Sequence, residues 1–376
     1  MADLVNSPAT RFWRSSAPLT LELGSVLPSY TLAYRTWGQL SSDGGNAVIV
    51  CHALTGTADA DLWWEPLFGA DKALDPTRDF IVCSNTLGGC YGSSGAASHD
   101  TDGLYRGSRF PALTVRDQVR AQMALADALG IKRIKLVIGG SMGGLQTLEW
   151  ALLDPKRVDA IVVIAASAQH SAWCMTWSEA QRMSLRADPK FCRGDYSRDD
   201  APKAGLGAAR ATAMITYRSP SALASRYGRH MGSAVFGGGA RHPDDFAVRG
   251  WMRHHAENFV NRFDANCYLT LIDAMDRHDV GHGRGGVMSA LARIEQPALV
   301  VAISSDGLYV PAEQELLYEA MPNAQWMELE SPHGHDAFLI EAVRLEPRIA
   351  RFRALVHSNP RQQTSFGSAE AATYAS

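Results

Sequence analysis

The sequence predicts an α/β protein with a mostly parallel central sheet and an inserted block of helices. Continuous apolar runs alternate with helical patterns up to about residue 166, as in parallel sheets covered by helices on both faces. No buried strand run occurs from there to about residue 290, and the sheet pattern then resumes. We therefore predict an α/β core of residues 1–166 and 291–360, a helical lid of residues 167–290 and a disordered tail at 361–376.

The amino-terminal part of the chain predicts four strands. Residues 19–24 and 30–37 alternate apolar and polar side chains, and Pro28 lies between them. This pattern indicates two antiparallel strands joined by a short loop. Residues 47–51 and 80–83 are apolar throughout, which is typical of strands buried on both faces of a sheet.

The next element is a helix with clear signals at both ends. Thr114 is a good N-cap, and Asp117 stands at the third helical position, where its carboxylate can complete a capping box. Val115 and Val119 repeat on one face, and Gly130 is a typical residue for the end of a helix. The apolar run at 135–140 follows directly, and a further strand is predicted at 158–166.

A serine lies at the sharp turn between the strand at 135–140 and the next helix. Gly139-Gly140-Ser141-Met142-Gly143 follows the strand, and a helical pattern begins directly after it. The glycines at positions 139 and 143 let the strand and the helix pass close together. Strand, Gly-x-Ser-x-Gly and helix in this order predict the nucleophile elbow of the α/β-hydrolase fold, with Ser141 as the nucleophile.

The predicted nucleophile needs a base and a carboxylate that orients the base. In this fold both follow the serine along the chain, the acid before the histidine. Asp306 comes directly after an apolar strand, and two histidines, His333 and His335, follow a short strand at 325–329. One histidine would accept the proton of Ser141, and Asp306 would stabilise the resulting imidazolium. The pattern does not distinguish His333 from His335.

An acyl-transfer site of this kind also needs two N–H groups that bind the oxyanion. One is expected from Met142, the residue after the nucleophile, and the other from the loop after an earlier strand. That loop here is His52-Ala53-Leu54-Thr55-Gly56, so Leu54 or Thr55 is the candidate donor. We expect His52 itself to have a structural role.

Composition excludes several other classes of function. A net charge of −3 and a pI near 6.5 give no electrostatic reason to expect a nucleic acid or a membrane as partner. The sequence shows no secretory signal, no membrane span, no nucleotide-binding fingerprint and no metal-ligand pattern. We therefore expect a cytoplasmic protein with no metal and with cysteines in the thiol form, namely Cys51, Cys83, Cys90, Cys174, Cys192 and Cys267.

Four strings together resemble one family, the homoserine O-acetyltransferases. The match runs from about residue 10 to 355 and includes the predicted lid. The segment 172–182 is most similar to the fungal branch, which also contains deacetylcephalosporin C and serine acetyltransferases. The four strings are Cys51–Gly56, Gly139–Trp150, Met214–Ser219 and Gly334–Leu339.

The resemblance assigns several residues that the pattern leaves open. It implies that His335, in Gly-His-Asp, is the catalytic histidine. It implies that Arg210, at the end of Gly-Leu-x-x-Ala-Arg, binds the substrate's amino-acid group and that Asp336 also contacts the substrate. Tyr217 and Thr55 carry over as further substrate-binding residues. A cation and an anion in one desolvated site suit a zwitterion.

The activity implied by the resemblance is transfer of an acetyl group from acetyl-CoA to the hydroxyl of L-homoserine, as in methionine biosynthesis. The reaction would use the triad in two displacements, with no bound cofactor and with only small molecules as substrates. The family also implies a homodimer formed through the lid helices. Open alternatives are L-serine or another hydroxyl acceptor, a succinyl donor, a short-chain acetyl esterase with the same triad, and a non-catalytic binding protein on this fold.

Overall fold

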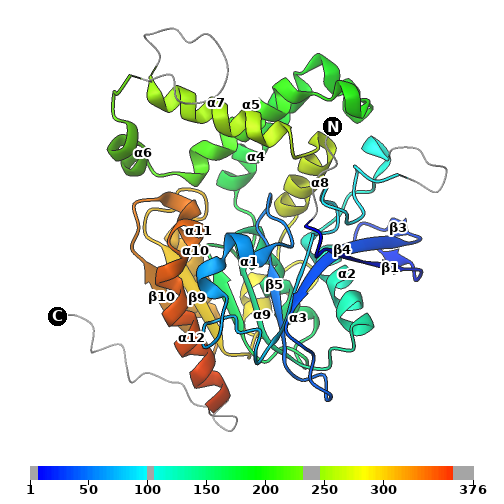
Figure 1. Cartoon of the computed structure of the whole chain (residues 1–376), viewed down its shortest axis with the longest axis vertical. Helices are drawn as coiled ribbons and strands as arrows, with labels where there is room; N and C mark the ends of the chain where they lie inside the picture. Colours follow the sequence, from blue (N-terminus) through cyan, green and yellow to red (C-terminus); the bar gives the residue numbers. More distant parts are fainter. Residues whose placement is uncertain (1–6, 100–105, 232–245, 359–376) are drawn as a thin grey trace.

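The computed structural model describes residues 7–99, 106–231 and 246–358 (Figure 1). The predicted tail at 361–376 lies outside the described residues. The centre of the molecule is an eight-stranded sheet in which β5 to β10 pair in parallel, and β1 and β4 extend one edge as antiparallel strands. This confirms the mostly parallel sheet. Its order is β1 (Arg11–Ser15), β4 (Tyr30–Trp37), β6 (Phe80–Ser84), β5 (Ala47–Cys51), β7 (Ile134–Gly140), β8 (Ile161–Ile164), β9 (Ala298–Ile303) and β10 (Ala324–Leu329).

Helices cover both faces of this sheet, which is why its inner strands are apolar throughout. Every residue of β5, β6, β8 and β9 is buried. Alternate residues of β5 enter different apolar clusters: Ile49 packs with α2 and α3, and Val48 packs with α1 and α12. The covering helices are α1 (Ala60–Trp63), α2 (Val115–Ala128), α3 (Met142–Leu153), α9 (Val287–Leu291), α10 (Pro311–Ala320), α11 (Ala337–Ile340) and α12 (Ala342–Ser358).

The pairing predicted for the first strands is wrong. The partner of β4 is β1, with Arg11 opposite Tyr34 and Ser15 opposite Tyr30. Of the strand predicted at 19–24, only Leu19–Thr20 is extended, as β2, and it pairs with β3 (Val26–Leu27) in a separate two-stranded sheet. The chain reverses at Gly24, which has φ +91°. The sequence of β1 gave no signal because most of its residues are exposed at the sheet edge.

The helix predicted after Thr114 is α2, and both of its end signals are confirmed. The Thr114 side chain accepts a hydrogen bond from the Asp117 amide, and the Asp117 carboxylate accepts one from the Thr114 amide, which completes the capping box. The helix ends at Ala128, and Gly130 follows with φ +78°. This helix packs against α3, the helix that follows the turn at Ser141.

The chain between β8 and β9 is helical in its described part. The helices packed on one another include α4 with α5 and α5 with α7, and Figure 1 shows them as a layer beyond one end of the strands. The helix α9 spans the predicted boundary at 290 and packs beside α10. The glycine-rich segment at 236–240 lies outside the described residues. The helices of this layer are α4 (Ala172–Arg186), α5 (Lys203–Tyr217), α6 (Pro220–Tyr227), α7 (Ala247–Val260) and α8 (Ala265–Asp276).

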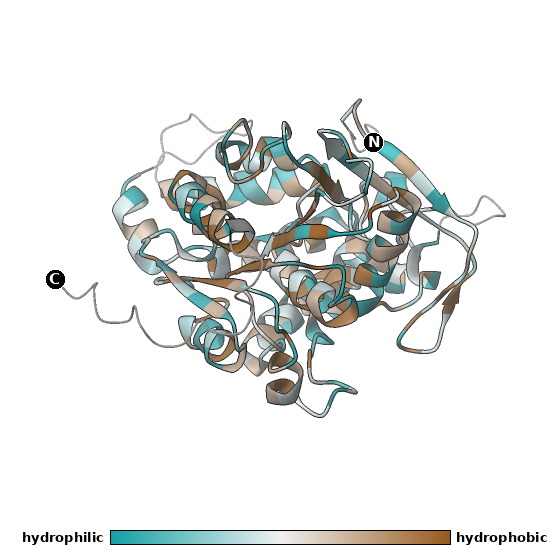
Figure 2. Ribbon diagram, turned by 90° about the horizontal axis from the view of Figure 1, so that it is seen from below, coloured by the Kyte–Doolittle hydropathy of each residue, from teal (hydrophilic) through white to brown (hydrophobic). Residues whose placement is uncertain are grey.

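Apolar residues are concentrated in the strands at the centre of the molecule. Figure 2 shows hydrophobic strands at the centre and mixed hydrophilic and hydrophobic colouring on the surrounding helices. Among the residues that the structure describes, no helix has the length and apolar character needed to cross a bilayer.

Candidate active site

Ser141 stands at a strained turn between β7 and α3. Its backbone has φ +56° and ψ −127°, which a residue with a side chain rarely adopts, and its amide donates to the Ile164 carbonyl at 3.0 Å. A Cβ on Gly139 would meet the Gly143 carbonyl oxygen at 2.3 Å, and a Cβ on Gly143 would meet that of Cys51 at 2.1 Å. The close passage of strand and helix expected from the Gly-x-Ser-x-Gly string is therefore present.

Asp306 and His335 meet in the loops that follow β9 and β10. The Nδ1 atom of His335 lies 2.7 Å from Oδ2 of Asp306, and both side chains are buried. The amides of Leu308 and Tyr309 donate to the other carboxylate oxygen at 2.8 and 3.0 Å, which holds the carboxylate in place. His333 is 40% exposed and faces Glu341 instead. The structure thus brings His335, and not His333, against Asp306.

The surroundings of His335 favour its role as a base. Burial lowers the pKa of the imidazole, but the charge of Asp306 and its hydrogen bond outweigh burial, so the pKa is raised above its ordinary value. Because a carboxylate only accepts, Nδ1 carries the proton. The Nε2 atom is buried and has no hydrogen-bond partner among the described residues. It is therefore free to accept a proton.

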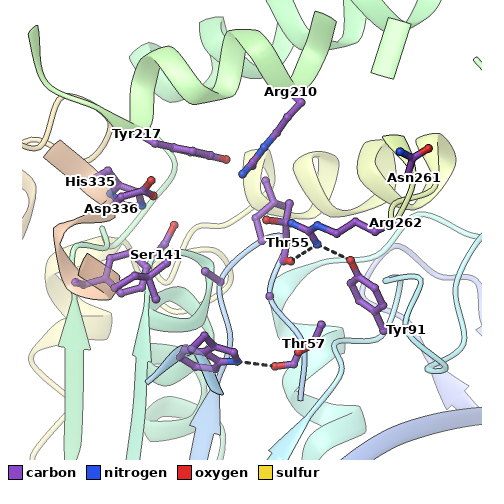
Figure 3. Close-up of a pocket in the computed structure, with 16 residues that line it drawn as sticks. Thr55, Thr57, Tyr91, Ser141, Arg210, Tyr217, Asn261, Arg262, His335 and Asp336 are labelled. Carbon is purple, nitrogen blue, oxygen red and sulfur yellow. Dashed lines mark hydrogen bonds between the residues drawn. The ribbon is translucent and has the colours of Figure 1, made fainter. Parts of the chain in front are cut away.

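Ser141 and His335 line one pocket of about 580 Å³ (Figure 3). The pocket lies between the loops at the end of the sheet and the helix α5, and the Ser141 hydroxyl points toward α5 in the close-up. Its wall is mainly apolar, with a few charged groups. The lining residues are Ala53, Leu54, Thr55, Gly56, Thr57, Trp63, Tyr91, Ser141, Arg210, Tyr217, Asn261, Arg262, His335, Asp336, Phe338 and Leu339.

Arg210 reaches the pocket from α5 and has unused hydrogen-bond donors. Its Nε and Nη1 atoms are buried and have no partner in the described part of the chain. The guanidinium lies 5.3 Å from the ring centre of Tyr217 and 4.9 Å from that of Phe259. Burial raises the pKa of Tyr217, so the phenol stays neutral beside Arg210. The aromatic rings hold the cation in position and leave its N–H groups available to an anion.

Asp336 gives the pocket a negative group close to the base. Its carboxylate forms an ion pair with Arg218 at 3.2 Å. Burial raises the pKa of Asp336, and the charges of Arg218, His335 and Arg210 act in the opposite direction. The carboxylate of Asp336 and the guanidinium of Arg210, with its unpaired Nε and Nη1, therefore line the same pocket as Ser141 and His335.

Of the predicted oxyanion donors, Leu54 and Thr55 line the pocket, and Met142 follows the pocket residue Ser141 directly. Met142 is the first residue of α3, where backbone N–H groups have no partner within the helix. Leu54 and Thr55 line the pocket in the loop after β5. His52 is buried, and burial lowers its pKa to about 4. Its hydrogen bonds to backbone atoms agree with the structural role expected from the sequence.

Sequence reasoning missed Arg262 and its partners. The Nη1 atom of Arg262, in the turn between α7 and α8, donates to the Thr55 carbonyl at 3.0 Å and to the Tyr91 hydroxyl. Figure 3 shows this arginine joining the loop after β5 to the loop that carries Tyr91. No spacing rule connects positions that are 207 and 171 residues apart in the chain. Only the folded structure brings them together.

The described residues contain no group of three His, Cys, Asp or Glu side chains that could hold a metal ion. His278 is buried, and burial lowers its pKa to about 4. It lies outside the pocket that contains Ser141.

Comparison with known proteins agrees with the fold of this chain. A family model described as alpha/beta hydrolase fold matches residues 46–342. A homoserine O-acetyltransferase of Trichormus variabilis is 51% identical over 348 residues, which cover 92% of this chain and 94% of that protein. The similarity of segment 172–182 to a fungal branch stays a prediction.

Solved structures show the same fold over nearly the whole chain. A homoserine O-acetyltransferase of Staphylococcus aureus is 27% identical with a TM-score of 0.72, and the match covers 91% of this chain and 94% of that one. The acetyl esterase MekB is 28% identical with a TM-score of 0.79, covering 92% and 96%. On the fold and the sequence identity, this chain belongs to the homoserine O-acetyltransferase family of the α/β-hydrolase fold.

Proposed function

We propose that this protein transfers an acetyl group from acetyl-CoA to the side-chain hydroxyl of L-homoserine. The observation that carries the proposal is the pocket that Ser141 and His335 line together with Arg210 and Asp336. A carboxylate and an ammonium on one small substrate match these two charges. The names of the relatives support the same acceptor and the same acyl group.

The first displacement acylates the serine. Ser141 Oγ attacks the thioester carbonyl, and Nε2 of His335 takes the hydroxyl proton. The C–S bond breaks, and the proton on Nε2 passes to the departing CoA sulfur. Asp306 stabilises the imidazolium that exists between these events. The N–H groups of Met142 and Leu54 bind the oxyanion of the tetrahedral intermediate.

The second displacement uses the same groups in reverse order. The carboxylate of homoserine binds Arg210, and its ammonium binds Asp336 in exchange for Arg218. Nε2 of His335 takes the proton of the homoserine hydroxyl as that oxygen attacks the acetyl carbonyl. The ester bond to Ser141 breaks, and the serine regains the proton. Tyr217 and Thr55 complete the wall around the amino acid.

Water competes with homoserine for the acetyl-serine, so ester hydrolysis is the second candidate function. The likeness to an acetyl esterase at 28% identity favours it. The helix α5 lies over Ser141 with Arg210 and Tyr217, and this cover favours transfer because it limits the access of water to the acetyl-serine. L-serine is a further candidate acceptor, because it has the same charged groups with a shorter side chain.

A panel of purified reactions tests the proposal. Acetyl-CoA and succinyl-CoA are each combined with homoserine, serine or water alone, and free thiol release is followed. We expect acetyl-CoA with homoserine to be the fastest pair by a wide margin. Equal thiol release with and without homoserine would support the esterase, and no release in any combination would support a binding protein.

We also propose that the protein acts in the cytoplasm in methionine biosynthesis and forms a homodimer through its lid helices. Large apolar side chains exposed on α4, such as Trp173 and Met183, support a contact between copies of this layer. Light scattering of the purified protein tests the dimer. A Met183→Glu variant should shift the mass to that of a monomer.

A further inference from the structure

His52 holds the peptide group that carries a proposed oxyanion donor. It follows β5 directly and is only 3% exposed. Its Nδ1 atom lies 2.7 Å from the carbonyl oxygen of Ala53. Its Nε2 atom lies 3.0 Å from the backbone N–H of Thr86. His52 is absent from the wall of the pocket, which begins with the next residue, Ala53.

These two contacts fix the protonation of the ring. A backbone N–H can only donate, so Nε2 of His52 accepts from Thr86 and carries no proton. Burial lowers the pKa of His52 to about 4, so the ring is neutral near pH 7 and its single proton is on Nδ1. The contact with the Ala53 oxygen is therefore an N–H donation from His52.

The Ala53 carbonyl and the Leu54 N–H belong to the same peptide group. Because a trans peptide is planar, its C=O and N–H point in opposite directions. A hydrogen bond that fixes the Ala53 oxygen also fixes the direction of the Leu54 N–H, and it polarises the peptide so that the N–H becomes a better donor. The Gly56 amide donates to the same oxygen at 2.8 Å.

We propose that His52 is a positioning residue for catalysis, which aims the Leu54 N–H at the oxyanion through the shared Ala53–Leu54 peptide. The proposal rests on the function proposed above, because it needs an oxyanion at that place. His52 touches no substrate in this account. Its effect on the reaction passes entirely through one backbone amide.

A buried hydrogen-bond network connects His52 to the helix that carries the other donor. The side-chain amide of Gln146, in α3, donates to the Thr86 hydroxyl at 3.2 Å, and that hydroxyl lies 3.2 Å from Nε2 of His52. Gln122 donates to Gln146 at 3.1 Å. The segments that supply the Leu54 and Met142 amides are therefore tied together beneath the pocket, which keeps the two donors at a fixed separation.

Two substitutions of His52 separate the role of Nδ1 from that of Nε2. In His52→Asn, the amide nitrogen can take the place of Nδ1 and donate to the Ala53 carbonyl. In His52→Gln, the longer amide reaches toward Thr86 and leaves that carbonyl without the side-chain donor. Each variant loses one buried hydrogen bond, so both should melt at lower temperature by similar amounts. His278→Gln is the matched control, because His278 is equally buried and lies outside the pocket.

The readouts are the single-turnover rate of Ser141 acylation by p-nitrophenyl acetate, the Kd of homoserine by calorimetry and the melting temperature. Loss of an oxyanion donor costs about 10²- to 10³-fold, so we expect His52→Gln to lower the acylation rate by roughly 10- to 100-fold. His52→Asn should stay within about fivefold of wild type, given its retained donor. The Kd of homoserine should be unchanged in both variants.

The results distinguish this proposal from the proposed function. A wild-type acylation rate in His52→Gln would overturn the role of His52. So would acylation rates that fall equally in His52→Asn and His52→Gln, in step with the melting temperature. In either case a Ser141→Ala variant without acylation leaves the proposed function intact. Full acylation by Ser141→Ala would instead overturn the function on which this proposal depends.

Discussion

The Nδ1 atom of His335 lies 2.7 Å from Oδ2 of Asp306, and neither side chain is more than 2% exposed. Two backbone amides hold the other oxygen of Asp306, so the carboxylate has one orientation and the imidazole is aligned with it. The opposite ring nitrogen of His335 stays unpaired among the described residues. This arrangement raises the pKa of His335 although the ring is buried.

The first prediction concerns the pH dependence of acylation. His335 must be neutral to act as a base, so the rate should rise with pH through the raised pKa of His335, above 6.5. In Asp306→Asn the charge of Asp306 is lost and burial dominates, so the acidic limb should move to lower pH. The rate itself should fall by about 10⁴-fold, because the imidazolium is no longer stabilised.

A sensitive fluorogenic acetate ester measures both effects in the Asp306→Asn variant. Glu341→Gln is a suitable control, since Glu341 faces His333 and not His335. An acidic limb at the same pH in wild type and Asp306→Asn would show that Asp306 does not set the pKa of His335.

The second prediction concerns the elbow glycines. In Gly143→Ala the new Cβ would lie 2.1 Å from the Cys51 carbonyl oxygen, which is backbone and cannot move aside cheaply. We expect the free energy of unfolding to fall by about 1–3 kcal/mol, as measured by urea denaturation. Gly250→Ala in α7, where nothing lies within 4 Å, should gain roughly 0.5–1 kcal/mol. Equal stability of the two variants would contradict the close packing at the elbow.

The third prediction separates the two charges of the substrate. Arg210→Gln should weaken binding of homoserine by roughly 10- to 100-fold, because a charge-assisted hydrogen bond is lost. The same variant should bind 3-aminopropan-1-ol, which has no carboxylate, as well as wild type does. Asp336→Asn should show the reverse preference, with 4-hydroxybutyrate, which has no ammonium, unaffected. Calorimetry measures the Kd of all three ligands for each variant. An equal loss of affinity for all three would contradict the roles proposed for Arg210 and Asp336.

The fourth prediction concerns stability in acid. Burial lowers the pKa of His278 to about 4, against the charges of Glu149 and Asp279, whereas the unfolded chain has the ordinary value of 6.5. The folded state therefore gains stability from neutral His278 above pH 6.5 and loses it as the pH falls toward 4. The slope is at most about 1.4 kcal/mol per pH unit. His278→Gln should have a shallower slope in urea denaturation, and an unchanged slope would disprove this contribution.

Local sequence signals predicted the parts of this structure that depend on neighbouring residues. The capping box of Thr114 and Asp117 and the turn at Ser141 are each encoded within a few positions, so their geometry follows from the local chain. The buried strands were readable because both of their faces are apolar. The order of elbow, acid and histidine followed from the fold, and the contact of Asp306 with His335 then distinguished the two histidines.

Contacts between distant segments left no such signal. The strand β1 is short and mostly exposed, so its pairing with β4 could not be read from alternation. Arg262 reaches Thr55 only because the helical layer folds over the sheet. Gln146 resembles any polar residue of a helix, yet it is fully buried and completes a network beneath the pocket. These positions are determined by tertiary packing rather than by local pattern.

The central claim is that Ser141 carries the acetyl group between donor and homoserine. The most direct test is mass spectrometry of the enzyme mixed with acetyl-CoA alone and then with homoserine. We expect one acetyl group on the peptide that contains Ser141, its discharge by homoserine to O-acetylhomoserine, and no adduct in Ser141→Ala. An acetyl group found elsewhere, or a Ser141→Ala variant whose transfer activity falls less than tenfold, would contradict it.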